Sequence, residues 1–480
     1  MFEMKRRSVL TGGSSLFLLT ALGGCERLRD QIANRPVRKD ISTLATNDPI
    51  LDAYRDAIGQ MQALGSSDPR NWTKQAEIHL NTCPHGNWFF LPWHRAYLMA
   101  MDDIVRTLTG DQSFSMPYWN WTCQRSIPVA FWQSGSVLNY SPRAAGPTSQ
   151  AVEAIVGPAN MANILGETDF ELFASGAATA LRGGGGFQGL LEQGPHNYIH
   201  GFTGGTMGTY MSPLDPIFWL HHCNIDRIWF DWNSAGNANT NDPTYVNFQL
   251  NGLFVDGNSQ PLEYQVGSLV LAPLLSYRYE NPQPCGVTFN RLDEQALRAL
   301  LEEGARQRIE VVERLDPVAT DITIGGARER SQSLPLPPRI SEKAFEETID
   351  NRLVLRLDDV SLSSNEENFF VRVFLNLPEG EKPSPDSPYY AGAFAFFVDE
   401  GHNHGPMNYA IDLSETVERL NAEQRLDGGS APSLSFELVP IRDDEKSLVA
   451  MRSARVRIGA VRPELIARKP EAAKIDVERQ

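Results

Sequence analysis

Two clusters of histidines, far apart in the sequence, constrain this 480-residue chain more than any other feature. The first cluster contains His79, His85 and His94, and the second contains His196, His200 and His222. His196 and His200 are four residues apart, so on a helix their imidazoles point from one face toward a common point. A single histidine is usually a surface or core residue, but two matched triplets indicate a site.

Each cluster offers three imidazoles and no carboxylate ligand. Three neutral nitrogens leave coordination positions open and favour a borderline metal such as copper or zinc. A structural zinc ion is bound by four protein ligands, with no coordination position left open. A zinc hydrolase is disfavoured because neither triplet has a carboxylate or a fourth ligand. Two matched triplets therefore predict two metals that share a bridging ligand.

A phenylalanine stands four residues before one histidine of each cluster, Phe90 before His94 and Phe218 before His222. On a helix this ring lies one turn from the imidazole and can fix its orientation. His221 is adjacent to His222, about 100° away around a helix, so only one of them can face the site. We expect the other to make a structural hydrogen bond.

These segments resemble the copper signatures of the tyrosinase, catechol oxidase and haemocyanin superfamily of type 3 dicopper proteins. The matching stretches are 68–72, 90–95, 116–121 and 215–227. The resemblance implies two copper ions, with O2 as co-substrate. It implies that the first copper is bound by His79, His85 and His94, and the second by His196, His200 and His222, the second histidine of the pair.

The resemblance also assigns roles to residues around the coppers. Cys83 stands where fungal members form a thioether with the second ligand, here His85. Glu192 and Asn197 stand where related enzymes hold a water, which can accept the proton of a monophenol. Tyr210 aligns with an aromatic gate residue over the second copper. The remaining cysteines, Cys123, Cys223 and Cys285, show no disulfide framework.

The function implied by the resemblance is a copper-dependent phenol oxidase that acts on small phenols. It would oxidise o-diphenols to o-quinones, and the Glu192 and Asn197 pair favours ortho-hydroxylation of monophenols as well. Two alternatives use the same histidines. An o-aminophenol oxidase would need a pocket without an effective base, and a haemocyanin-like oxygen carrier would have to hide its coppers from phenols.

The pattern of apolar residues changes along the chain. Helical spacing is found in 40–65, 94–108, 195–202 and 216–232, whereas strand-like alternation is found in 353–357, 369–377, 391–398, 434–439 and 454–458. The resemblance implies an antiparallel four-helix bundle that holds the dicopper centre, followed by an all-β sandwich that shields it in latent forms. A glycine run, Gly183 to Gly186, lacks the Lys-Ser/Thr of a phosphate loop and is expected to be a mobile loop.

These patterns predict the division of the chain. We expect an export signal over 1–24, a catalytic domain over 36–285, a connecting segment and Pro-rich linker over 286–338, a β sandwich over 339–463 and a polar tail over 464–480. In the related enzymes a Tyr-x-Tyr motif, here Tyr277 and Tyr279, closes the catalytic domain. An N-terminal arginine, here Arg38, packs against it.

The N-terminus and the net charge indicate where the protein acts. Lys5-Arg6-Arg7 precedes a mildly apolar stretch, the pattern of a twin-arginine export signal, and Leu22 to Cys25 resembles a lipobox. We therefore expect export to a bacterial periplasm or cell envelope, with membrane attachment only through a lipid on Cys25. The net charge of -16 disfavours nucleic acid as a partner. The sequence leaves the oligomeric state open.

Overall fold

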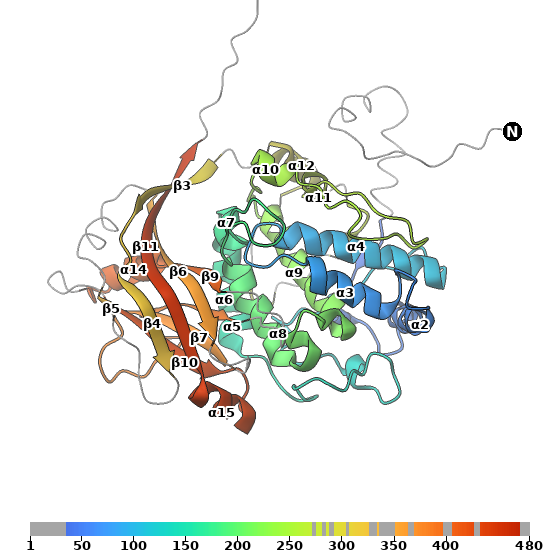
Figure 1. Cartoon of the computed structure of the whole chain (residues 1–480), viewed down its shortest axis with the longest axis horizontal. Coiled ribbons are helices and arrows are strands. Elements are labelled where there is room, and N and C mark those ends of the chain that lie inside the picture. The colour runs from blue at the N-terminus through green and yellow to red at the C-terminus, as the bar shows by residue number, and fades with distance from the viewer. Residues whose placement is uncertain are drawn as a thin grey trace, which may run out of the picture.

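The computed structural model describes residues 35–270, 275–280, 285–287, 292–303, 307–325, 334–335, 351–362, 369–396, 406–426 and 433–470. A helical region comes first in the chain, and a region of β strands packs against one side of it (Figure 1). The predicted export signal and lipobox, and residues 471–480 of the polar tail, lie outside the described residues. Within the described part of the chain, every helix is too short or too polar to cross a bilayer.

Four longer helices form the frame of the helical region: α2 (Pro49–Ala63), α3 (Trp72–Thr82), α4 (Phe90–Thr109) and α9 (Ile217–Ser234). Asp48 caps α2 by accepting from the Ile50 amide, and Asn71 caps α3 by accepting from the Thr73 amide. Helix α4 ends at Gly110, whose φ of 77° is the left-handed conformation that favours glycine. Helix α4 contacts both α2 and α9, so it is the centre of this region.

Shorter elements join these helices. They are α5 (Glu153–Val156), α6 (Pro158–Gly166), α7 (Phe170–Phe173), a π-helical turn (Glu192–His196), α8 (Asn197–Thr203), α10 (Pro243–Val246), α11 (Val266–Leu269) and α12 (Glu294–Glu303). The predicted helix over 195–202 is therefore a π-helical turn followed by α8. The π-helical turn contains Pro195, which has no amide hydrogen to donate within a helix.

Two sheets form the β region. One has the order β5-β10-β7-β8, and the other has the order β3-β11-β6-β9 with β4 also paired to β11. Their strands are β3 (Gln307–Arg314), β4 (Ala319–Gly325), β5 (Leu334–Pro335), β6 (Asn351–Leu362), β7 (Phe369–Leu375), β8 (Tyr390–Ala395), β9 (Met407–Asp412), β10 (Ser433–Pro440) and β11 (Arg455–Pro470). Apolar residues of both sheets share one core, so the sheets form a sandwich.

The fold class predicted from the sequence is confirmed, with additions that the strand pattern did not reveal. Two helices, α14 (Ser414–Ala422) and α15 (Glu445–Ser453), are part of the predominantly β region. Strands β3 and β4 come from the segment expected to be a connection, and β11 continues beyond residue 463 to Pro470. Strands β3 and β11 are rich in charged residues, which obscured their apolar alternation.

The β sandwich packs directly on the helical region. Strand β6 places Leu353, Leu355 and Leu357 in the sandwich core, while Val354 points the opposite way. Val354 packs with Leu172 and other apolar side chains of the helical region. Around Val354, strand β6 is therefore buried on both faces.

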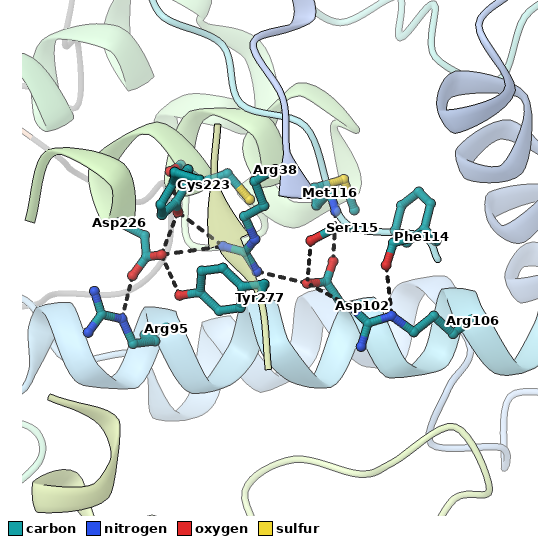
Figure 2. Close-up of polar contacts among 11 residues, drawn as sticks. Arg38, Arg95, Asp102, Arg106, Phe114, Ser115, Met116, Cys223, Asp226 and Tyr277 are labelled. Carbon is teal, nitrogen blue, oxygen red and sulfur yellow. Dashed lines mark hydrogen bonds and ion pairs between the residues drawn. The ribbon is translucent and has the colours of Figure 1, made fainter. Parts of the chain in front are cut away.

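Arg38 lies in a buried ionic network between the helices (Figure 2). It is held on β1 (Val37–Arg38), which pairs in parallel with β2 (Arg278–Tyr279). Its Cζ lies 3.6 Å from the centroid of the Tyr277 ring, and its Nη1 donates to the Tyr279 hydroxyl at 3.3 Å. The predicted packing of Arg38 on the Tyr-x-Tyr motif is confirmed.

The structure corrects the prediction that the cysteines carry no disulfide framework. Cys123 and Cys285 form a disulfide, with Cα atoms 5.4 Å apart, a separation that a disulfide can span. The two cysteines are 162 residues apart in the sequence, so only the tertiary fold brings them together. Cys83 and Cys223 are free and buried.

Candidate metal centre

The predicted histidines are carried by the helices at the centre of the helical region. In the first group, His79 lies on α3, His94 lies on α4, and His85 lies in the loop between them. In the second group, His196 ends the π-helical turn, His200 lies on α8, and His222 lies on α9. The contact between α4 and α9 brings the two groups together.

The side chains of each group converge. One ligand atom each of His79, Cys83, His85 and His94 lies within 4.8 Å of the others, and the same holds for His196, His200, His221 and His222. The rings of His94 and His222 stack at 4.1 Å with an interplanar angle of 6°, which joins the groups into one centre. The structure thus brings all six predicted histidines together and adds Cys83 and His221.

Hydrogen bonds at Nδ1 determine how four of these imidazoles can act. The Nδ1–H of His79 donates to the Tyr210 carbonyl at 2.7 Å, and that of His94 donates to the Phe90 carbonyl at 2.8 Å. His196 donates to Asn197 Oδ1 at 2.9 Å, and His200 donates to the Met207 carbonyl at 2.6 Å. Because a carbonyl oxygen can only accept, Nδ1 carries the proton and Nε2 keeps its lone pair for a metal.

Burial keeps these imidazoles neutral, as metal ligands must be. Desolvation lowers the pKa of His94 and His200 to about 3, and it lowers the pKa of His79, His196 and His222 well below the usual value. His200 Nε2 and His222 Nε2 are 3.2 Å apart, close to the spacing of two nitrogens that each lie about 2 Å from one metal ion. The donor set therefore fits a metal bound through Nε2.

His221 is distinguished from His222 by its hydrogen bond. The indole N–H of Trp121 donates to Nδ1 of His221 at 3.2 Å, which confirms the predicted structural hydrogen bond. Burial lowers the pKa of His221, so its ring is neutral. A neutral imidazole that accepts at Nδ1 carries its proton on Nε2. This nitrogen has no lone pair for a metal, which favours His222 as the ligand.

Phe90 and Phe218 each contact a histidine of both groups. The Phe90 ring centroid lies 4.8 Å from that of His94 and 4.7 Å from that of His196. The Phe218 ring centroid lies 4.3 Å from that of His222 and 5.1 Å from that of His79. Each phenylalanine therefore packs against imidazole rings of both histidine groups. The sequence spacing predicted a contact with only one histidine each.

Cys83 lies beside His85, as the predicted thioether requires. Its Sγ is 3.8 Å from Nδ1 and 3.9 Å from Nε2 of His85, nearly equal distances from the two nitrogens that flank Cε1. Sγ is also 3.4 Å from Nε2 of His94. Burial raises the pKa of the Cys83 thiol well above its usual value, so the group is protonated at neutral pH.

The position of Tyr210 corrects the prediction that it covers the second copper. Its hydroxyl is 3.0 Å from Nδ1 of His85 and its ring centroid is 5.0 Å from that of His85, both in the first group. The residue lies within the second cluster in sequence, between His200 and His222. However, the turn that carries it leads into a short 3-10 helix, Ser212–Leu214, which packs against α3.

Glu192 and Asn197 are both buried at the centre and have different partners. The Glu192 carboxylate accepts from the Gly86 amide at 2.8 Å and from the Ser175 hydroxyl. Burial raises the pKa of Glu192 to about 8. The Asn197 amide accepts from His196 through Oδ1, and its Nδ2 donates to the Ala395 carbonyl of β8 at 2.9 Å. The β sandwich therefore touches the residue that orients His196.

Sequence reasoning missed several partners of the centre. Ser175 binds the Glu192 carboxylate, Trp121 sets the tautomer of His221, and the Met207 carbonyl sets that of His200. Trp121 belongs to a matched motif and could have been assigned a role, but a serine or a main-chain carbonyl has no distinguishing signal in one sequence.

Comparisons with known proteins cover both regions. Residues 60–170 and 139–235 match the model of the common central domain of tyrosinase, and residues 319–461 match a domain of unknown function (DUF7868). The chain is 25% identical to a tyrosinase of Hahella sp. (strain CCB-MM4), over 86% of this chain and 97% of that protein. It is 27% identical to a chloroplastic polyphenol oxidase of Vitis vinifera, over 81% of this chain and 71% of that protein.

A solved structure that contains both a helical region and a β sandwich has the same fold as this chain. The latent form of an aurone synthase (polyphenol oxidase) matches with a TM-score of 0.64 and 22% sequence identity, over 91% of each chain. The shared fold therefore includes the helical region and the β sandwich together.

Proposed function

We propose that this chain, whose relatives are tyrosinases and polyphenol oxidases, is a copper phenol oxidase that oxidises o-diphenols to o-quinones and hydroxylates monophenols at the ortho position. The observation that carries this proposal is the pair of histidine groups, in which hydrogen bonds at Nδ1 direct Nε2 inward. Each o-diphenol gives up two electrons and two protons, and O2 is reduced to water.

The proposed copper ligands are the six histidines predicted from the sequence. They are His79, His85 and His94 for one ion, and His196, His200 and His222 for the other. When bound, the copper ions supply the binding of O2 and the transfer of electrons from the phenol. The protein supplies neutral imidazoles in fixed tautomers, and Phe90 and Phe218 hold the rings. We also propose the thioether between Cys83 and His85.

Glu192 is the proposed proton acceptor for a monophenol. A phenol hydroxyl has a pKa of about 10, and an ordinary carboxylate is too weak a base to take its proton readily. Burial raises the pKa of Glu192 to about 8 in the metal-free site. Bound cations would favour its ionised form, which is the form that can accept a proton. Asn197 holds His196 in its tautomer and so positions a ligand.

The experiment is O2 uptake by the copper-loaded protein with p-cresol, 4-methylcatechol and 2-amino-4-methylphenol, together with its copper content. We expect two copper ions per chain and uptake with the monophenol and the catechol. Glu192→Gln keeps an acceptor for the Gly86 amide but cannot take a proton. It should lower monophenol turnover by roughly 100-fold or more, with much less effect on the catechol.

The control is Glu153→Gln, because Glu153 is a surface residue that pairs with Arg125. An equal loss with both phenols in Glu192→Gln would assign Glu192 a structural role. Wild-type uptake with the catechol alone would contradict hydroxylation, and a preference for the aminophenol would support the o-aminophenol oxidase. Reversible O2 binding without turnover would support the carrier.

We also propose export, which rests on the N-terminal twin-arginine pattern alone. Fractionation of the native cells, with the mass of the mature chain, tests the route and the lipid on Cys25.

A further inference from the structure

His85 is the proposed ligand with the greatest solvent exposure. Among the six proposed ligands, His85 is half-buried, whereas the other five are buried. The Tyr210 ring packs edge-on against His85. A substrate that approaches the centre past His85, a side that we call the entrance, would therefore pass Tyr210 and the groups next to it.

The glycine run, which the sequence predicts to be a mobile loop, packs against the segment that follows His85. Residues Gly183 to Gly186 all have φ between 71° and 101°, a conformation that favours glycine. A Cβ atom on Gly186 would lie 2.4 Å from the Gly86 carbonyl oxygen, next to His85. The Asn87 side chain donates to the Leu181 carbonyl at 3.0 Å. The loop is therefore shaped to lie on the His85 segment.

This loop carries Arg182 to the entrance. Arg182 Nη1 donates to the carbonyls of Leu80 at 3.1 Å and Asn81 at 2.9 Å, which end the helix that bears His79. Its Cζ lies 5.4 Å from the centroid of the Tyr210 ring. The side chain is exposed. The guanidinium of Arg182 is thus held beside the Tyr210 ring, which itself contacts His85. This positive charge lies on a protein with a net charge of -16.

We propose that Arg182 is a specificity-determining residue that binds the carboxylate of phenolic acids as their ring enters beside His85. Arginine suits this role because its planar guanidinium pairs with a carboxylate through directed hydrogen bonds. A propionate side chain would carry the carboxylate away from the phenol ring, on the side where Arg182 lies 5.4 Å from the Tyr210 ring centroid. This inference rests on the proposed function and adds the substrate class.

The test compares 3-(3,4-dihydroxyphenyl)propionate with its neutral amide, which differ only in charge at the end of the side chain. The copper-loaded full chain should have a higher kcat/KM for the acid, mainly through a lower KM. Arg182→Gln keeps a donor for the Leu80 and Asn81 carbonyls but removes the charge. It should lower the ratio of kcat/KM for acid over amide by roughly 5- to 10-fold.

Two controls make the result specific. Arg457→Gln removes a charge from an exposed arginine on β11 that pairs with Asp321, and it should leave the ratio unchanged. Raising the salt concentration should reduce the wild-type preference for the acid, because an exposed ion pair is screened. An unchanged ratio in Arg182→Gln, or an equal loss with both substrates, would overturn the inference.

The amide separates this inference from the proposed function. If wild-type protein oxidises the amide, the proposed function holds whatever the ratio shows. If neither substrate is oxidised, the proposed function fails, and equilibrium dialysis of 3-(4-hydroxyphenyl)propionate against both proteins decides the role of Arg182. Weaker binding to Arg182→Gln would support that role, and equal binding would contradict it.

Discussion

At the scale of single residues, the partner at Nδ1 decides what each buried histidine can do. His79, His94 and His200 donate to main-chain carbonyls, so their tautomer does not depend on any side chain. His221 instead accepts from Trp121, and this reverses its tautomer. Two adjacent histidines on one helix therefore differ in chemistry because of one indole N–H.

The thioether between Cys83 and His85 can be tested at the scale of single residues. When the copper-loaded protein has been exposed to O2, we expect Sγ of Cys83 to be bonded to Cε1 of His85, because Sγ already lies near both flanking nitrogens. Bond formation removes the thiol hydrogen and the Cε1 hydrogen, and O2 takes up the electrons. Mass spectrometry of the peptide should show the loss of two hydrogen atoms.

Cys223 is a matched control for this prediction, because it is also free, buried and next to a proposed ligand. It should remain a thiol that reacts with an alkylating reagent after denaturation. Alkylation of Cys83 in the denatured copper-loaded protein would show that no thioether had formed.

At the scale of elements, an ionic network holds α4 against α9 next to the centre. The Asp226 carboxylate accepts from Arg95, which directly follows His94, and Asp226 itself is four residues after His222. Arg38 joins Asp226 to Asp102, and Tyr277 donates to Asp226 (Figure 2). Although burial alone would raise the pKa of Asp226, the charges of Arg95 and Arg38 lower it. The network therefore keeps its charge.

We expect Asp226→Asn to lower the free energy of unfolding by about 3–5 kcal/mol, because it leaves the buried Arg95 without its counter-charge and removes one of the two carboxylates that pair with Arg38. It should also reduce copper content, since the network fixes the helices that bear His94 and His222. Denaturant titration measures the first effect and metal analysis the second. Asp52→Asn removes an exposed partner of Arg55 and should cost less than about 1 kcal/mol. A similarly small loss of unfolding free energy in Asp226→Asn and Asp52→Asn would show that the buried network does not stabilise the helices.

At the scale of the whole molecule, the β sandwich and the helical region meet at charged as well as apolar contacts. Arg352 of β6 forms ion pairs with Glu167, which follows α6, and with Asp412 of β9. These residues line a cavity of about 1090 Å³ between the two regions. Burial raises the pKa of Glu167 to about 7, although the charge of Arg352 opposes this shift.

The Glu167 pKa predicts a pH dependence of stability. Because its pKa is higher in the folded protein than in an unfolded chain, its contribution is most favourable below about pH 4.5 and is lost as the pH rises toward about 7. The change is on the order of 3 kcal/mol, since each pKa unit corresponds to about 1.4 kcal/mol. Glu167→Gln, which does not titrate, should flatten this part of the unfolding profile.

Unfolding measured by denaturant between pH 4 and pH 8 would check this expectation. Glu153→Gln is the matched control, because Glu153 lines the same cavity but is exposed. It should keep the wild-type profile. If the unfolding free energy of Glu167→Gln changed with pH in parallel with that of the wild type, Glu167 would not govern the pH dependence.

The sequence by itself determined several of the elements and the type of site. Helical spacing around Tyr54 and Ile58 and alternation around Leu355 follow from local periodicity, and both appear in the structure. The six histidines stand in motifs whose chemistry depends on residue type and spacing. Such signals are local, so one sequence contains them.

Only the tertiary structure decided which distant groups meet. The Cys123–Cys285 disulfide, the placement of Tyr210 on the first histidine group and the position of Arg182 beside Tyr210 all depend on contacts between residues far apart in the chain. The raised pKa of Glu192 likewise arises from burial, which a side chain acquires only when several elements pack around it. Long-range packing sets these features, and local sequence patterns do not encode them.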